Sequence, residues 1–449
     1  MQAFALVAQS DPAFQLLAAR WQMAFTLGAH IILAVLGVGM PVLLLVAEFR
    51  WLSTRDRVWR SLAHRWSKKF AVLFAVGAVS GTVLSFELGL LWPGFMHRFG
   101  AVIGFPFAME GFAFFLEAVF LGIYLYGWDR LSPWVHWLCG VPVAVSGAAS
   151  AWFVVTVNAW MNAPRGFRIE DGRVVEVEPV AAMLNPATGP ETAHMLVAAY
   201  MVAGFLVASC YAWRLRREPN SAYYRRAMSL GLLMGVVMTP VQFVVGDWIA
   251  QHVAEFQPVK LAAMEGQFKT EAYAPARIGG WPDAADRTTK YAIEVPGMLS
   301  WLAYHDRAAV VHGLDEFPLE DQPPVAVVHF SFQLMVCIGT LLLCLALYVA
   351  AMLAWRRQIP QGPKFLWLVM LAGPLSVVAL ETGWMVTEVG RQPWIVQGIA
   401  RTTDMVTLSP YVGWSLLAAV AMYAVIGFGT WRVLRLLAAV PLAEDSRAT

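Results

Sequence analysis

The sequence carries little charge for its length, and this scarcity excludes an ordinary soluble protein. Only 14% of its 449 residues are Asp, Glu, Lys or Arg, whereas 59% are hydrophobic. Soluble domains contain about 25% charged and about 45–50% apolar residues. Because apolar runs recur along almost the whole chain, we expect a single transmembrane domain over residues 1–449 rather than several soluble domains.

Other features are missing as well, and each absence narrows the function. The formal net charge is only +2, and no basic patch points to nucleic acid. No positive cluster precedes a short apolar core and a cleavage site at the N-terminus, so we expect no signal peptide and a retained first helix. The cysteines lie in apolar segments without CxxC spacing, which argues against disulfides and Cys-bound metals. They are Cys139, Cys210, Cys337 and Cys344.

What the chain has in abundance is long apolar stretches. Nine of them approach or exceed the roughly 20 residues with which a helix crosses the hydrocarbon core, and many end in Trp or Tyr, which prefer the headgroup layer. We therefore predict an all-α membrane protein with nine transmembrane helices in a bundle. The expected ranges are 21–47, 70–92, 105–126, 134–158, 192–213, 227–248, 325–355, 365–388 and 411–431.

Positive residues concentrate in alternate connections between these helices. The connections after the first, fifth and seventh helices are rich in Arg and Lys, as is typical of cytoplasmic loops. We therefore predict that the N-terminus lies outside and the C-terminus in the cytoplasm. The longest connection, residues 249–324, is then an external loop. It has no obvious secondary structure, and its charged and aromatic residues favour a binding role.

Two histidines and a methionine inside the predicted helices are candidate iron ligands. An ionisable residue at mid-membrane costs about 2.5–3.5 kcal/mol on insertion scales, so each needs a reason. His30, among small residues, is either an axial ligand or a histidine hydrogen-bonded to a neighbouring helix. A His/Met pair such as His194 and Met335 ligates low-spin heme in electron-transfer proteins. Met is also common helix filler, and His329 is a rival ligand.

Buried glutamates form the second group of candidates. Glu110 and Glu117 are seven residues apart, so they share one helix face about 10.5 Å apart. They are interpreted either as a proton relay or as two carboxylates neutralised by partners. Glu381 and Glu388 repeat this spacing, and Glu388 is close enough to the outer end to be a ligand or a capped terminal residue.

Three sequence segments resemble those of a known protein family and so suggest roles for these candidate residues. FPFAMEGFAFFLEAVFLGIYLYGWDRL (105–131), NAWMNAP (158–164) and GWMVTEVGRQPW (383–394) resemble the signature segments of cytochrome bd oxidase subunit I, and the similarity covers nearly the whole chain. The resemblance implies a heme-bearing subunit that oxidises quinol and helps to reduce oxygen to water. SGTVLSFELGLLWPGF (80–95) and the short external loop resemble the cyanide-insensitive branch of the family.

The resemblance also implies roles for single residues. His194 and Met335 match the ligands of a low-spin heme b. His30 and Glu388 match the axial ligands of two further hemes, a high-spin heme b and heme d, with a third heme b as the alternative to heme d. Arg391 resembles a residue that neutralises heme propionates. Trp384 is similar to an aromatic between the hemes, though a structural tryptophan is equally compatible with the sequence.

Four residues are implied to handle protons and quinol. Glu110 and Glu117 resemble the proton-path carboxylates of the family. VKLAAMEG (259–266) resembles its quinol-binding segment, which makes Lys260 and Glu265 candidates for hydrogen bonding and deprotonating the quinol. The alternative for this pair is two solvated loop charges.

The sequence departs from the best-known family pattern at two places. Gln333 stands where many members have an arginine, two residues before the methionine ligand. Ser85 stands where many have a glutamate, and Glu87 follows it closely. The first departure puts in doubt a positive charge beside the low-spin heme.

The sequence therefore predicts a multi-pass protein of the bacterial cytoplasmic membrane that generates proton-motive force without pumping. Its expected partners are subunit II of the oxidase, a small single-helix subunit, membrane lipid, quinol and oxygen. Two alternative functions are a proton-coupled transporter and a diheme cytochrome b. A proton-coupled transporter usually shows related halves and interrupted helices, which we do not find. A diheme cytochrome b that does not reduce oxygen would show histidine pairs repeated on two helices, which are also not found.

Overall fold

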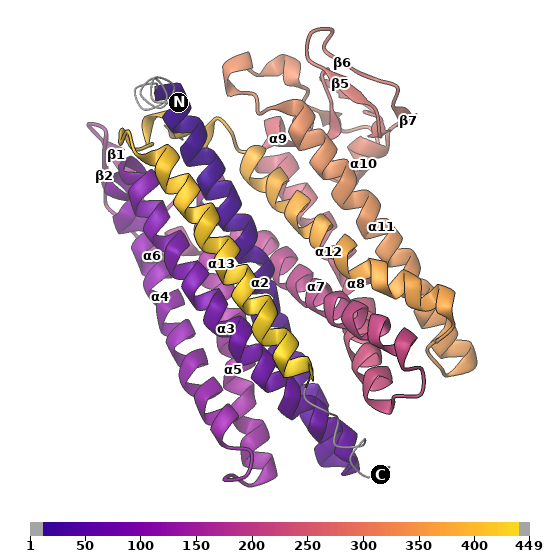
Figure 1. Cartoon of the computed structure of the whole chain (residues 1–449). Coiled ribbons are helices and arrows are strands. Elements are labelled where there is room, and N and C mark those ends of the chain that lie inside the picture. The colour runs from indigo at the N-terminus through magenta and orange to yellow at the C-terminus, as the bar shows by residue number, and fades with distance from the viewer. Residues whose placement is uncertain (1–11, 440–449) are drawn as a thin grey trace, which may run out of the picture.

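The structure is a computed structural model that describes residues 12–439. Over this part of the chain, nine helices are long and apolar enough to cross a membrane, as predicted (Figure 1). The expectation about a signal peptide falls on residues outside the described range. The nine helices are α2 (Pro12–Thr54), α3 (Arg57–Leu91), α4 (Pro93–Tyr126), α5 (Pro133–Asn162), α7 (Thr188–Arg217), α8 (Ala222–Phe256), α11 (Val325–Arg356), α12 (Pro363–Val389) and α13 (Val412–Ala439).

The helices extend well beyond their apolar cores. α2 has 43 residues, whereas hydropathy alone predicts a helix over 21–47. In a membrane every backbone polar group must be satisfied within the segment, and the same ladder of hydrogen bonds continues into the polar flanks. Local signals fix the ends: Pro93, Pro133 and Pro363 stand in first turns, and the Asp56 side chain accepts a hydrogen bond from the backbone of Val58 at the start of α3.

The bundle consists of two groups of helices joined through α2 and α7. On one side, α2 packs on α3 and α5, α4 packs on α5, and the C-terminal α13 covers α2 and α3. On the other side, α7 and α11 each pack on both α8 and α12, so that α7 and α11 lie diagonally across this second group. Ligand-type side chains on α7 and α11 can therefore face one another across the space between α8 and α12.

The long loop lies over one end of the bundle, above α8 and α11 (Figure 1). The connections α2–α3, α7–α8 and α11–α12, which carry the positive residues, lie at the opposite end. This arrangement is the one that alternating antiparallel helices require. It agrees with the predicted separation of the long loop from the positively charged connections.

The long loop is more ordered than its sequence suggests, which corrects the prediction of a segment without regular structure. α8 continues to Phe256, so the loop starts later than residue 249. Its strands have only two or three residues, too few to show a periodicity, and one pair joins distant segments at Glu271 and Val311. The loop contains α9 (Pro258–Glu265), α10 (Met298–Tyr304), β3 (Glu271–Ala272), β4 (Ala276–Ile278), β5 (Trp281–Asp283), β6 (Thr288–Lys290), β7 (Ile293–Val295), β8 (Val310–Val311), η1 (Leu314–Glu316) and η2 (Leu319–Asp321).

Shorter elements close the remaining connections at the same end. Two antiparallel pairs, β1 with β2 and β9 with β10, lie next to the ends of α5 and α12. They follow the NAWMNAP and GRQPW segments in the chain. The elements are β1 (Arg168–Glu170), β2 (Arg173–Val175), α6 (Pro179–Met183), β9 (Trp394–Val396), β10 (Ala400–Arg401) and η3 (Thr402–Asp404).

Candidate functional site

The imidazole of His194 on α7 is held by a side chain rather than by the backbone. The Nε2 atom of Gln242 on α8 lies 3.2 Å from Nδ1 and 3.0 Å from Nε2 of the ring. One turn further along α8, a Cβ atom at Gly246 would lie 3.7 Å from the ring, so the glycine leaves room beside it. An amide side chain can rotate away, so His194 can present a ring nitrogen to iron.

Met335 on α11 lies against a glycine of α12. A Cβ atom at Gly383 would come within 3.0 Å of the Met335 Sδ atom, so the thioether occupies space that any larger residue would take. His194 and Met335 thus lie on the diagonal helices α7 and α11, on either side of the space lined by α8 and α12. This placement suits two axial ligands of one flat cofactor.

His329, the rival ligand, is tied to the backbone instead. Its side chain is fully buried, with Nδ1 2.9 Å from the carbonyl oxygen of Met264 and Nε2 3.2 Å from that of Gly279. Both ring nitrogens face loop carbonyls. Iron binding would therefore require the loop to detach from α11.

His30 on α2 has one nitrogen engaged by a neighbouring helix. Its Nδ1 atom lies 2.9 Å from the Oγ atom of Ser80 on α3, and a Cβ atom at Gly81 would lie 3.1 Å from the ring. The two interpretations of His30 are therefore compatible. Metal-binding histidines commonly make such a second hydrogen bond through the other ring nitrogen.

Glu388 lies at the C-terminal end of α12, where its carboxylate is held from two sides. The Arg391 guanidinium pairs with Oε2 at 2.6 Å, and the amide of Asn158 on α5 hydrogen bonds to Oε1. Arg391 is buried, with 2% of its surface exposed. An oriented carboxylate beside a buried cation is a donor set that suits both iron and a propionate.

Asn162 joins this carboxylate to a larger buried cluster. Its Oδ1 atom accepts hydrogen bonds from Gln257 at 3.0 Å, from Lys260 at 3.2 Å and from Arg391 at 3.3 Å. Its Nδ2 atom donates to Glu191 at 2.7 Å. Sequence reasoning gave no role to Glu191, Asn162 or Gln257. Glu191, an ionisable residue three positions before His194, is the one that the same search for intramembrane charge would have found.

Lys260 and Glu265 are buried, which excludes the solvated loop pair. They are 3% and 6% exposed on the eight-residue α9. Burial lowers the pKa of Lys260 to about 7, and Glu191 partly opposes this shift. Burial raises the pKa of Glu265 to about 7, and the nearby Arg277 partly opposes it. The two residues thus have different neighbours: Lys260 joins the Glu388 cluster, whereas Glu265 lies near Arg277.

Glu110 and Glu117 both face α5 from one side of α4. The Ser150 hydroxyl donates to Glu110 Oε1 at 3.2 Å, and a Cβ atom at Gly147 would lie 3.2 Å from Glu117 Oε1. Glu117 is only 4% exposed. The two carboxylates therefore lie in the same seam between α4 and α5, as their spacing predicts.

Three further residues flagged by the sequence have defined places. Trp384 packs against an apolar cluster that includes residues of α2, the helix of His30, and of α7, the helix of His194. Glu87 is buried on α3 and accepts a hydrogen bond from the side chain of Gln22 at 2.8 Å. Ser85 is exposed and hydrogen bonds within its own helix.

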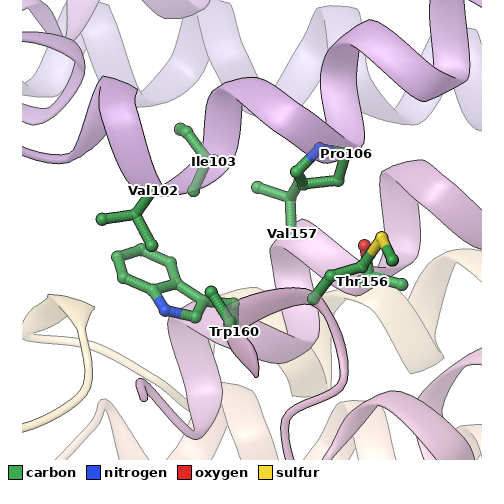
Figure 2. A pocket seen from close by; sticks show the side chains of 8 residues that line it. Val102, Ile103, Pro106, Thr156, Val157 and Trp160 are labelled. Atoms are coloured by element: carbon green, nitrogen blue, oxygen red, sulfur yellow. The ribbon is translucent and has the colours of Figure 1, made fainter. Parts of the chain in front are cut away.

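A small pocket between α4 and α5 is separate from these candidates. Figure 2 shows its lining, and among its described lining residues none is ionisable. It is a packing defect between apolar side chains rather than a catalytic site. The lining residues are Val102, Ile103, Pro106, Thr156, Val157, Trp160, Ala182 and Met183.

Comparison with known proteins gives consistent matches over almost the full length. Residues 18–440 match the family model described as cytochrome bd terminal oxidase subunit I. The chain is 39% identical over 419 residues to the putative cytochrome bd menaquinol oxidase subunit I of Bacillus subtilis (strain 168), covering 92% of this chain and 94% of that protein. It is 29% identical over 475 residues to the cytochrome bd-II ubiquinol oxidase subunit 1 of Escherichia coli (strain K12), covering 90% and 92%.

A solved structure extends the likeness to three dimensions. The bd oxidase from Geobacillus thermodenitrificans superposes with a TM-score of 0.89 at 39% sequence identity, covering 95% of this chain and 98% of that chain. The nine-helix arrangement is therefore shared with a solved bd oxidase.

Proposed function

Because the chain belongs to the cytochrome bd terminal oxidase subunit I family, we propose that its buried His, Met and Glu side chains hold heme iron and link quinol oxidation to oxygen reduction. Membership in this family makes the chain a multi-pass subunit of a quinol oxidase, with heme cofactors, quinol as substrate and another subunit as partner. The assignments below go further and are specific to this chain.

His194 and Met335 are assigned to the low-spin heme b. The single observation that carries the assignment is the contrast between the two histidines of this region. Among the hydrogen bonds of residues 12–439, the His194 ring has only the rotatable amide of Gln242, whereas both ring nitrogens of His329 face backbone carbonyls. Gly383 also leaves space for the Met335 thioether.

His30 and Glu388 are assigned to the other two hemes, a high-spin heme b and heme d, or a third heme b in its place. Arg391 neutralises a heme propionate, and Trp384 separates the heme sites. When bound, the hemes supply electron transfer and the oxygen chemistry. The protein supplies ligands, burial and hydrogen bonds, which set the heme potentials.

The chain's own residues move the protons. In the external loop (249–324), Glu265 accepts a proton from quinol, and Lys260 links this segment to the Glu388 cluster. Oxidation of two quinols releases four protons outside, and reduction of one oxygen to two waters consumes four from the cytoplasm. Glu117 and Glu110 carry these inward protons along the seam between α4 and α5. Separation of the two half-reactions thus generates proton-motive force without pumping.

The setting follows from the same proposal. The protein lies in the bacterial cytoplasmic membrane with its N-terminus outside, and contacts lipid, subunit II of the oxidase and a small single-helix subunit. The positive connections at the end opposite the loop support this orientation.

A reduced-minus-oxidised spectrum of the purified complex, recorded after adding quinol, tests the proposal. A low-spin b band together with a red-shifted chlorin band or additional high-spin b signal, and oxygen uptake driven by quinol, are the expected results. Absence of heme would instead favour the proton-coupled transporter. Heme b without oxygen uptake would favour the diheme cytochrome b.

A further inference from the structure

The external loop (249–324), here named the quinol loop, is connected to the outer end of α11 by contacts that the proposed mechanism does not use. Met335 is the ligand candidate on this helix, and His329 and Gln333 precede it by six and two residues. At 1.5 Å per residue, they lie about 9 Å and about 3 Å from Met335 along the helix axis. Both side chains point to loop backbone rather than into the helix bundle.

His329 holds the segment that carries Glu265. Its Nδ1 atom lies 2.9 Å from the carbonyl oxygen of Met264, the residue before Glu265. Gly266, the residue after it, has a positive φ of 61°, and a Cβ atom there would lie 3.4 Å from the same ring nitrogen. The His329 ring therefore contacts the chain on both sides of the candidate base.

Gln333 holds a second segment of the loop through both ends of its amide. Its Nε2 atom donates to the carbonyl oxygen of Arg277 at 2.9 Å, and its Oε1 atom accepts from the Gly279 amide at 3.1 Å. His329 Nε2 lies 3.2 Å from the carbonyl of Gly279 as well. The side chain of Arg277 is the cation that opposes the raised pKa of Glu265.

The held segment is a tight turn built on two consecutive glycines. Gly279 and Gly280 have φ values of +66° and +92°, a conformation that glycine adopts without strain. Directly after the turn, the Trp281 ring lies 5.1 Å from that of Phe330 on α11. Loop and helix thus meet through two polar side chains and one aromatic pair, in addition to apolar packing of Val328 against Met264 and its neighbours.

We propose that His329 and Gln333 are positioning residues for quinol oxidation, which fasten the quinol loop to α11 and so fix Glu265 relative to Met335. This inference rests on the proposed function. It also explains Gln333 at a position where an arginine would supply charge: a glutamine can both donate to one loop carbonyl and accept from one loop amide, whereas an arginine has no acceptor.

The test compares two substitutions with a control in the purified complex. Gln333→Met keeps the length of the side chain and removes both hydrogen bonds; His329→Phe keeps a ring and removes both nitrogens. The control is Thr340→Val on the same helix, because the Thr340 hydroxyl bonds only to Val336 of its own helix among the contacts the structure describes. Three quantities are measured: amide hydrogen exchange, steady-state quinol oxidation and the reduced-minus-oxidised spectrum.

We expect faster exchange over residues 264–280 in both variants and not in the control. The kcat of quinol oxidation should fall roughly 3- to 10-fold, about the effect of losing one buried hydrogen bond, with a much smaller change in KM, because a displaced base weakens the transition state more than it weakens substrate binding. The low-spin heme spectrum should persist. A merely structural contact would loosen the loop or lower stability without separating KM from kcat.

An unchanged kcat in Gln333→Met overturns the inference, whatever the exchange rates show, and this variant alone is the test if His329→Phe fails to fold. Loss of the low-spin spectrum in His329→Phe also overturns it, because His329 would then be a ligand. If the unsubstituted complex cannot oxidise quinol, the proposed function itself fails, and this outcome is distinguishable from the other two.

Discussion

The Ser80 hydroxyl donates to the carbonyl oxygen of Gly77 at 3.0 Å and also lies 2.9 Å from Nδ1 of His30. A hydroxyl has one proton, so Ser80 must accept the hydrogen bond from His30. Nδ1 therefore carries the ring proton, and the Nε2 lone pair is left for iron. The tautomer that a heme ligand needs is fixed by this pair of residues.

Replacing Ser80 by Ala should weaken the heme site at His30. Loss of such a supporting hydrogen bond typically costs about 10- to 100-fold in metal affinity, so heme content at this site should fall while the low-spin signal persists. Pyridine hemochrome quantification and the oxidised spectrum measure this. Ser85→Ala is the matched control, because the Ser85 hydroxyl bonds to Gly81 of its own helix. Equal heme content in both variants would contradict the assignment.

Substitution of Met335 by Leu should remove the low-spin heme signal and leave the other hemes largely intact. Leu fills a similar volume but offers no sulfur to iron. His329→Phe should retain that signal, since both its nitrogens face loop carbonyls. Redox-difference spectra of the two variants decide between the two candidates. The opposite pattern would make His329 the ligand.

The pH dependence of quinol oxidation should follow Glu265. Burial raises the pKa of this carboxyl to about 7, and a base must be ionised to accept a proton. At limiting quinol the rate should therefore rise with pH through about 7 and level off above it. Glu265→Gln should abolish this rise and lower the rate by roughly 100-fold or more, the usual contribution of a general base. Glu316→Gln, an exposed carboxylate of the same loop, should keep the wild-type profile.

Glu117→Gln should slow oxygen reduction without preventing heme reduction by quinol. An amide cannot carry a proton along the seam between α4 and α5, so electrons should accumulate on the hemes during turnover. Stopped-flow absorbance measures heme reduction by quinol. Proton uptake from the lumen side of reconstituted vesicles measures proton transfer separately. Normal proton uptake in this variant would place the relay elsewhere.

Asn162→Leu should destabilise the protein, because it leaves buried donors of Gln257, Lys260 and Arg391 without their shared acceptor. Each unsatisfied buried donor costs about 1–3 kcal/mol, so thermal unfolding of the complex should shift downward by several degrees. Asn220→Leu in the exposed α7–α8 connection is the control. A shift no larger than that of the control would show that the cluster is solvated.

Hydropathy predicted the nine helices because a membrane leaves few alternatives for an apolar run. It predicted helices that are too short at both termini, as for α2, because helical hydrogen bonding continues into polar residues that lower the hydropathy of a window. The seam of Glu110 and Glu117 was also predictable, since a seven-residue spacing within one helix fixes a common face.

Contacts between distant segments could not be predicted in the same way. Glu191 joins the Glu388 cluster because Asn162, on a different helix, donates to its carboxylate. Lys260 and Glu265 look like one pair in the sequence, yet they join different clusters, because the faces of α9 are set by its packing against α8 and α11 rather than by its own residues. The pairing of β3 with β8 in the loop is likewise not predictable from local sequence patterns.

The short helix α9 has a consequence for inhibition. Its eight residues span about 12 Å, with Lys260 hydrogen bonded to Asn162 and Glu265 at the opposite terminus. A displacement of one end of so short a helix should therefore also move the other end. If a heme lies beside Glu388 as proposed, a compound that binds beneath the loop should change the visible absorption of that heme as well as compete with quinol, and a single titration would report both events.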